Sequence, residues 1–178
     1  MVPSAEQASA LHRKYHSNDK IVEHCRACAA ISLRLCRRAA AQGNMVDERA
    51  AVSAALLHDI GRSRTQLVDH GHVGAAILEE EGVDKEVVEI VRRHVGAGIS
   101  TEEAASLGFP AGDYVPRTLE QKIVCFADKM LDGDRARPFV EEEKRFVKKG
   151  HDVERLRQLK RDVDVAVGGD AESLVLFG

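Results

Sequence analysis

The sequence lacks several features that mark particular classes of protein. It has no tryptophan, only two tyrosines, and no apolar run near the roughly 18 residues that can span a bilayer. Its start, Met-Val-Pro-Ser-Ala-Glu-Gln, lacks the basic and then apolar layout of a secretory signal. The net charge of -3 gives no electrostatic reason for nucleic-acid or membrane binding. We therefore expect a cytoplasmic protein with neither a nucleic-acid nor a membrane partner.

Cysteine is also sparse, and the four cysteines do not form a disulfide framework. Cys25 and Cys28 make a Cys-x-x-Cys, but a zinc site of this kind would need a second pair. A thioredoxin-like site would need a strand-helix-strand context, and the sequence gives no sign of one. We expect the cysteines to be small buried side chains.

Strand-like alternation and tight hairpin signals are scarce, whereas apolar residues recur at helical spacing. The pattern therefore predicts an all-α protein. The first 16 residues read as a short arm, with His12 and His16 exposed. The expected helices cover about residues 18–42, 47–60, 69–82, 84–94, 118–131 and, with a break near Gly150, 139–167.

With 178 residues, of which 44% are hydrophobic, the chain suits one domain spanning residues 1–178. We place the core at about 18–136 and charged C-terminal helices at about 139–167. A long irregular segment, 95–117, separates the fourth and fifth core helices. Within it, Ser100-Thr-Glu-Glu103 is a capping box and predicts one short helix. Long loops often carry binding function, so we expect this one on the substrate side.

The most informative motif is His58-Asp59, within Leu-Leu-His-Asp-Ile-Gly-Arg. Alone, such a pair is more often a histidine satisfied by its neighbouring carboxylate. However, His24, Asp59 and Asp128 all fall in apolar helical stretches, where an unpaired buried carboxylate costs several kcal/mol. A shared metal ion would satisfy all of them. Neighbours on a helix diverge by about 100°, so His58 and Asp59 would approach an ion from two sides.

The chain resembles the HD-domain superfamily of metal-dependent phosphohydrolases, in its HDIG subgroup. The residues that carry the resemblance are His24, His58-Asp59-Ile60-Gly61 and Asp128. Two further histidines are similar to the extra ligands of dinuclear members. The first is His70, in His-Gly-His-Val-Gly-Ala, because it lies four residues before Gly74 as in the family motif. His72 is then a spare histidine without a ligand role. The second additional ligand is His94.

Within the superfamily, bacterial symmetrical dinucleoside tetraphosphate hydrolases show a similar pattern. Archaeal HDIG-domain proteins of unassigned substrate look more similar still. The residues that support this second likeness are Gly96-Ala97-Gly98-Ile99 and Asp113-Tyr114-Val115-Pro116. The resemblance implies an HD-domain helical bundle, but it leaves the substrate open.

The resemblance also implies two divalent metal ions. One would take His24, His58, Asp59 and Asp128, and the other Asp59, His70 and His94. Imidazole and carboxylate ligands favour Fe, Mn, Zn, Co or Ni over calcium, with Mg an option at one position. A hydroxide bridging the ions would attack phosphorus, with Asp59 and Arg62 as catalytic residues. We expect a small phosphorylated substrate, such as a nucleotide or dinucleoside polyphosphate.

Several cations near the motifs are candidates for holding phosphate, since arginine contacts phosphate at two points. The alternative for each is an ordinary solvated cation. Phe109 and Tyr114 would either stack on a nucleobase or anchor their loop. Asp132 would either accept a hydrogen bond from a metal-ligating residue or face solvent. The charged C-terminal helices suit a solvated face or a homodimer contact. The candidate substrate-binding cations are Arg62, Arg93, Lys129 and Arg135.

Two other functions remain open at this point. A small branch of the superfamily uses the same six-ligand pattern, with two irons, to oxygenate small organic molecules. A non-catalytic module that senses a nucleotide or a metal ion is the other possibility.

Overall fold

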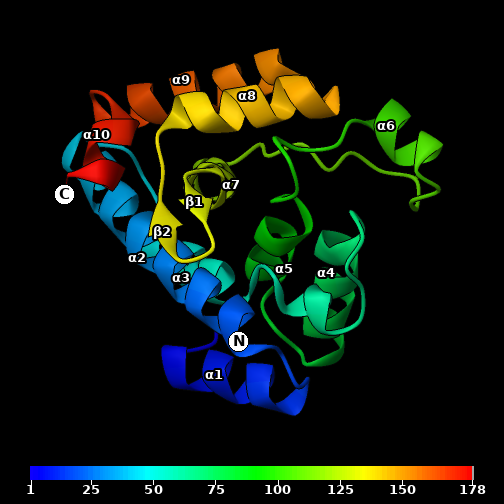
Figure 1. The fold of residues 1–178 in the computed structure, drawn as a ribbon. Helices are drawn as coiled ribbons and strands as arrows, with labels where there is room; N and C mark the ends of the chain where they lie inside the picture. Colours follow the sequence, from blue (N-terminus) through cyan, green and yellow to red (C-terminus); the bar gives the residue numbers. More distant parts are fainter. Residues whose placement is uncertain (178) are drawn as a thin grey trace.

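The computed structural model describes residues 1–177, which form ten α-helices, one 3-10 helix and a two-stranded hairpin. The all-α prediction is confirmed. Figure 1 shows α2 as the long diagonal element, with α4 and α5 on one side and α8 and α9 across the end of the bundle. Among these residues, no helix has the length and apolar character that crossing a membrane requires. The elements are α1 (Ala5–Lys14), α2 (Asp19–Ala41), α3 (Glu48–Leu57), η1 (Ile60–Ser63), α4 (His70–Glu80), α5 (Lys85–Arg92), α6 (Thr101–Ser106), α7 (Leu119–Lys129), β1 (Leu131–Asp132), β2 (Arg135–Ala136), α8 (Phe139–Lys149), α9 (Val153–Val167) and α10 (Ala171–Leu176).

Side-chain caps define where the central helices begin. Asn18 and Asp47 accept hydrogen bonds from backbone amides in the first turns of α2 and α3, and Thr118 forms a capping box with Gln121 at α7. These three helices pack against one another, and α5 and α9 pack on them from either side. One hydrophobic core runs through this assembly from Ala8 of α1 to Val175 of α10.

Two local predictions are confirmed. Ser100 and Glu103 form the expected capping box at the start of α6. The charged C-terminal segment breaks at Gly150, which ends α8 in the left-handed conformation at φ 68°. Glycine carries no Cβ penalty there, so the chain can turn sharply into α9.

Other local predictions are wrong. α3 ends at Leu57, so His58 and Asp59 lie in the turn after the helix rather than on it. α5 likewise ends before His94. The β1–β2 hairpin was not expected, because two-residue strands are too short to show alternation.

His12 is buried, not exposed. Its Nε2 lies 2.7 Å from the carbonyl oxygen of Leu56, and its Nδ1 lies 2.8 Å from Ser17 Oγ. The imidazole therefore ties α1 to the end of α3, close to the His58-Asp59 turn. Both ring nitrogens have a polar partner, which offsets the cost of burial.

Candidate metal centre

Six candidate ligands from five parts of the chain meet at one place in the fold. They lie at one end of a helix, in the turn that follows one, or, in the case of His24, in the second turn of α2. Because α2, α3, α5 and α7 pack around a common core, these positions converge even though they span more than 100 residues of sequence. Four of them, His58, Asp59, His70 and His94, are buried. The six are His24 in α2, His58 and Asp59 after α3, His70 at the start of α4, His94 after α5 and Asp128 in α7.

The first cluster joins α2, the turn after α3, and α7. The Nε2 atom of His24 lies 3.1 Å from Nε2 of His58 and 2.9 Å from Oδ1 of Asp128. Nε2 of His58 lies 3.6 Å from the same Asp128 oxygen and 3.9 Å from Oδ2 of Asp59. Two imidazoles and two carboxylates thus direct their donor atoms into one small space.

The second cluster shares Asp59 with the first. The Nε2 atoms of His70 and His94 lie 3.2 Å apart. Oδ1 of Asp59 lies 3.3 Å from Nε2 of His70 and 3.5 Å from Nε2 of His94. One oxygen of Asp59 therefore faces the second cluster, while the other faces the first.

All four imidazoles hold the same tautomer, because each Nδ1 lies against a backbone carbonyl. The carbonyl oxygens belong to Gly133 for His24, Ala55 for His58, Leu67 for His70 and Val91 for His94, at 2.6–2.8 Å. A carbonyl can only accept, so Nδ1 carries a proton, and each ring in its neutral form presents a lone pair at Nε2. Metal-binding histidines are commonly oriented in this way.

This donor set fits metal ions. Oδ1 of Asp59 is buried and has no hydrogen-bond partner among the described residues, although such groups are normally satisfied. With bonds of about 2.0–2.1 Å, neighbouring donors around one ion lie roughly 2.9–3.4 Å apart. The Nε2 pairs at 3.1 and 3.2 Å lie within that range. A cation between facing lone pairs would remove their repulsion and satisfy Asp59.

The charge states of His70, His94 and the two carboxylates suit a metal. Burial lowers the pKa of His94, and burial together with the neighbouring His94 ring lowers the pKa of His70 to about 3, so both rings are neutral at pH 7. Burial opposes ionisation of Asp59 and Asp128, but nearby imidazoles, and Lys129 beside Asp128, hold the pKa of each carboxyl below its usual range. Neutral imidazoles and ionised carboxylates are the forms that bind metal. Burial opposes protonation of His24 and His58, but Asp128 beside His24, and Cys25, Cys28 and Asp59 near His58, raise the pKa of these two rings, so an ion would displace a proton there.

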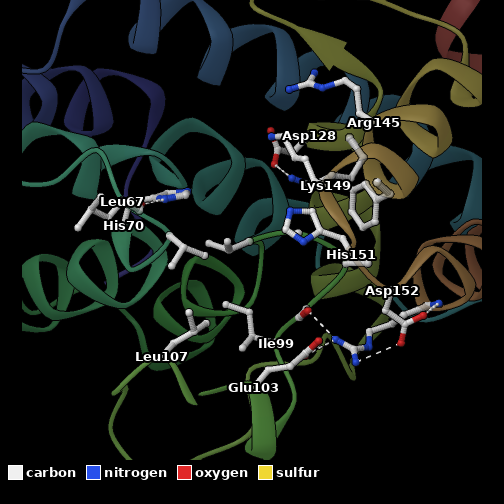
Figure 2. Close-up of a pocket in the computed structure, with 18 of the residues that line it drawn as sticks. Leu67, His70, Ile99, Glu103, Leu107, Asp128, Arg145, Lys149, His151 and Asp152 are labelled. Carbon is white, nitrogen blue, oxygen red and sulfur yellow. Dashed lines mark hydrogen bonds and ion pairs between the residues drawn. The ribbon is translucent and has the colours of Figure 1, made fainter. Parts of the chain in front are cut away.

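Beside the ligands is a cavity of about 650 Å³, and two of them, His70 and Asp128, line it. Figure 2 shows both side chains at its wall, with Ile99 and Leu107 contributing apolar surface. The irregular segment after His94 therefore lies at the cavity, through residues 95–99 and α6.

Two of the four candidate substrate-binding cations reach this cavity. Arg62 lines it, forms an ion pair with Asp59 at 2.7 Å between Nε and Oδ2, and donates from a terminal nitrogen to Nε2 of His70 at 3.2 Å. Lys129 also lines it, with Nζ 2.6 Å from Oδ2 of Asp128.

The structure does not bring the other two cations to the cavity. The guanidinium of Arg93 donates to the carbonyl oxygens of Asp113 and Val115 and pairs with Glu89, so it pins the long loop. Arg135 is an exposed residue of β2 and is not among the lining residues. The side chain next to a ligand in the sequence can point away from the site. For this reason the sequence wrongly placed Arg93 and Arg135 at the cavity.

The spare histidine lies outside both clusters. Nδ1 of His72 is 3.1 Å from Arg92, and its ring lies near those of Phe109 and Tyr114. Tyr114 is buried and donates its hydroxyl to the carbonyl oxygen of Pro110, so it anchors the loop rather than facing the cavity.

Two contributions were missed in the sequence. The hairpin orients His24 through the Gly133 carbonyl, whereas the neighbouring Asp132 is exposed. The charged C-terminal segment also lines the cavity, through Arg145 and Lys149 of α8 and through His151 in the turn after it. The one sequence signal for the charged segment was the break at Gly150, because the chain turns there and α9 packs back against α7.

Comparison with known proteins identifies the family. Residues 21–131 match the family model of the HD domain. The chain belongs to the HD domain family. Membership places it in a superfamily of metal-dependent phosphohydrolases, and the histidine and aspartate clusters could hold the ions such a protein needs. No solved structure gave a match to this HD domain.

Curated relatives of this HD domain include longer proteins. It is 35% identical over 98% of its length to a protein of Thermoplasma volcanium named tRNA (cytidine(56)-2'-O)-methyltransferase, and 34% identical over 97% to one of that name from Picrophilus torridus. It covers 51% and 50% of those proteins, or about half their length. An uncharacterized protein of Methanocaldococcus jannaschii is 46% identical over 66% of this chain and 70% of its own.

Proposed function

We propose that this HD domain hydrolyses a phosphate ester of a small molecule, a nucleotide or dinucleoside polyphosphate, with two divalent transition-metal ions. The observation that carries the proposal is the position of Asp59. Its two oxygens face two separate imidazole clusters, and Oδ1 is buried without a hydrogen-bond partner in residues 1–177. A carboxylate that joins two donor clusters is typical of sites that bind paired ions.

In this proposal, His24, His58, Asp59 and Asp128 hold one ion, and Asp59, His70 and His94 hold the other. The nitrogen and oxygen donors suit Fe, Mn, Zn, Co or Ni, with Mg an option at one position. Bound divalent ions lower the pKa of a coordinated water toward about 7 and neutralise charge on phosphoryl oxygens.

The protein's own contribution is to bind and orient the phosphate. Arg62 and Lys129 line the cavity beside Asp59 and Asp128, so both reach the edge of the ligand cluster. The Arg62 side chain is 31% exposed, which leaves part of its guanidinium open to the cavity. Arginine can contact two phosphate oxygens at once, which fixes the phosphorus in one orientation.

The test is a screen of phosphate esters, with dinucleoside polyphosphates and cyclic nucleotides included, against Mn, Fe, Ni, Co, Zn and Mg in turn. We expect phosphate release that depends on the metal and is lost on chelation. Asp59→Asn should lose it, whereas Asp132→Asn, which changes an exposed carboxylate, should retain it. Oxygen consumption with a mixed-valent di-iron signal would identify an oxygenase instead. Tight nucleotide binding without product under every metal would identify a sensor.

A second candidate places the phosphate ester in tRNA. Its support is the name of the two longer relatives, which concerns tRNA and applies to proteins about twice the length of this chain. Adding tRNA to the same screen separates the candidates. Hydrolysis of a tRNA phosphate in preference to free nucleotides would favour this one.

A further inference from the structure

The inner face of α8 supplies positive charge to the cavity from outside the part of the chain that matches the family model. Arg145 and Lys149 lie four residues apart, one turn along the helix, and both line the cavity. The matched region ends at residue 131, before α8 begins. Figure 2 shows both side chains on the side of the cavity away from Leu67 and Leu107.

Most other cations at the cavity are already neutralised. Arg62 pairs with Asp59, and Lys129 pairs with Asp128. Arg155 donates to Glu103 at 2.6 Å. Each of these three cations already has a carboxylate partner, so Arg62 and Lys129 act at the ligand cluster, and Arg155 holds the long loop.

Arg145 and Lys149 differ from these. Within residues 1–177, the side chain of Lys149 has no ion-pair partner and no hydrogen-bond partner. Arg145 approaches Glu142 only at 3.6 Å and Asp132 at 4.0 Å, without a hydrogen bond. Glu142 is already held by Arg137 at 2.5 Å. The α8 face therefore presents donors that a ligand in the cavity can use.

The position of this face is fixed. Phe146 lies between the two cations in sequence, is buried in the core, and packs edge-on against His151 at 5.5 Å between ring centroids. The buried Arg137–Glu142 pair holds the start of the same helix. The helix that carries the two cations therefore has a fixed position relative to the ligand cluster, and a substrate must span from one to the other.

We propose that Arg145 and Lys149 form a second anion site in the cavity, so that the substrate carries two anionic groups. One is the scissile phosphate at the ligand cluster, and the other is a second phosphate bound by α8. This inference rests on the proposed function for the first group, but the second site depends only on α8. The substrate class is a nucleotide with two or more phosphate groups.

The test compares ligands that differ by one phosphate: AMP with ADP, and AMP with adenosine 3′,5′-bisphosphate. Dissociation constants are measured by calorimetry on the metal-loaded protein, and KM replaces Kd for any ligand that is turned over. We expect at least one second phosphate to tighten binding about tenfold, the size of two partly exposed ion pairs. The double variant Arg145→Gln, Lys149→Gln should abolish that gain and leave the AMP constant within about twofold.

Lys148→Gln is the matched control, because Lys148 is an exposed neighbour on α8 that does not line the cavity. It should keep the full gain. If no second phosphate tightens binding in the parent, or if the gain persists in the double variant, the second anion site is wrong. The second anion site is tested by binding, whereas the proposed function is tested by phosphate release. The failure of one can therefore be told from the failure of the other.

Discussion

The backbone of Gly61 packs directly against the carbonyl oxygen of His70, the first residue of α4. A Cβ on Gly61 would overlap that oxygen and lie 2.6 Å from the amide nitrogen of Gly74. The turn that carries Asp59 and the helix that carries His70 therefore depend on this glycine for their separation.

Gly61→Ala should consequently push α4 away from the turn. We expect the free energy of unfolding to fall by about 2 kcal/mol or more, as for other overpacked sites, and metal binding to weaken. Urea denaturation and metal analysis of the purified variant check this. Gly169→Ala is the control, because a Cβ there meets no atom within 4 Å. Equal stability of the two variants would show that the contact relaxes at no cost.

Removing the shared carboxylate should affect both clusters. Asp59→Ala is expected to abolish turnover and to lower bound metal at both positions, because each cluster loses an oxygen. Metal content per chain, measured by mass spectrometry, checks this against Asp132→Ala. A variant that retained its full metal content would show that the imidazoles and Asp128 suffice.

Histidines 70 and 72 provide a test of register. His70→Ala should reduce bound metal and activity strongly, because His70 lies 3.3 Å from Asp59 and 3.2 Å from His94. His72→Ala should do far less, because its ring contacts Arg92 instead. The measurements are metal content and initial rate for the two variants side by side. The reverse order of effects would contradict the assignment.

Asp170 gives a pH test away from the metal ligands. Hydrogen bonds from Lys160 and Ser173 lower the pKa of Asp170 to about 2, against about 3.9 in an unfolded chain. A depressed carboxyl stabilises the fold above the unfolded pKa and loses that contribution as the pH falls from about 4 to about 2. Asp170→Asn should therefore lower stability at pH 7 by about 0.5 kcal/mol, a modest value because the side chain is 49% exposed.

The difference between the two proteins should close by about pH 2, and urea titrations at pH 7, 4, 3 and 2 follow it. Other groups titrate alike in both proteins and cancel. Because asparagine also caps helices well, α10 should keep its start. A difference that stays constant with pH would show that the Lys160 pairing does not set the stability of this segment.

Local sequence signals predicted what depends on near neighbours. Helical spacing and caps such as Asn18 and Thr118 located the main helices, and Ser100 with Glu103 located α6. His70, not His72, faces the second cluster, as the resemblance to the family motif implied through the spacing to Gly74.

What failed depended on distant contacts. His12 looked exposed because its partner, the Leu56 carbonyl, lies 44 residues away. Arg93 looked like a phosphate ligand because nothing local revealed that the carbonyls of Asp113 and Val115 would take its guanidinium. Residues of α8 reach the cavity only because α9 returns against α7, and no periodicity encodes such a path.

Three of the imidazoles, those of His58, His70 and His94, donate to carbonyls only three residues upstream. Their orientation is thus built by short stretches of backbone and exists before any ion arrives. Little side-chain entropy is then lost on loading, and one metal can leave and another enter while the helices stay in place. The ion found in the purified protein should follow the supply of the growth medium, and exchange should leave the melting curve of the helices unchanged in shape.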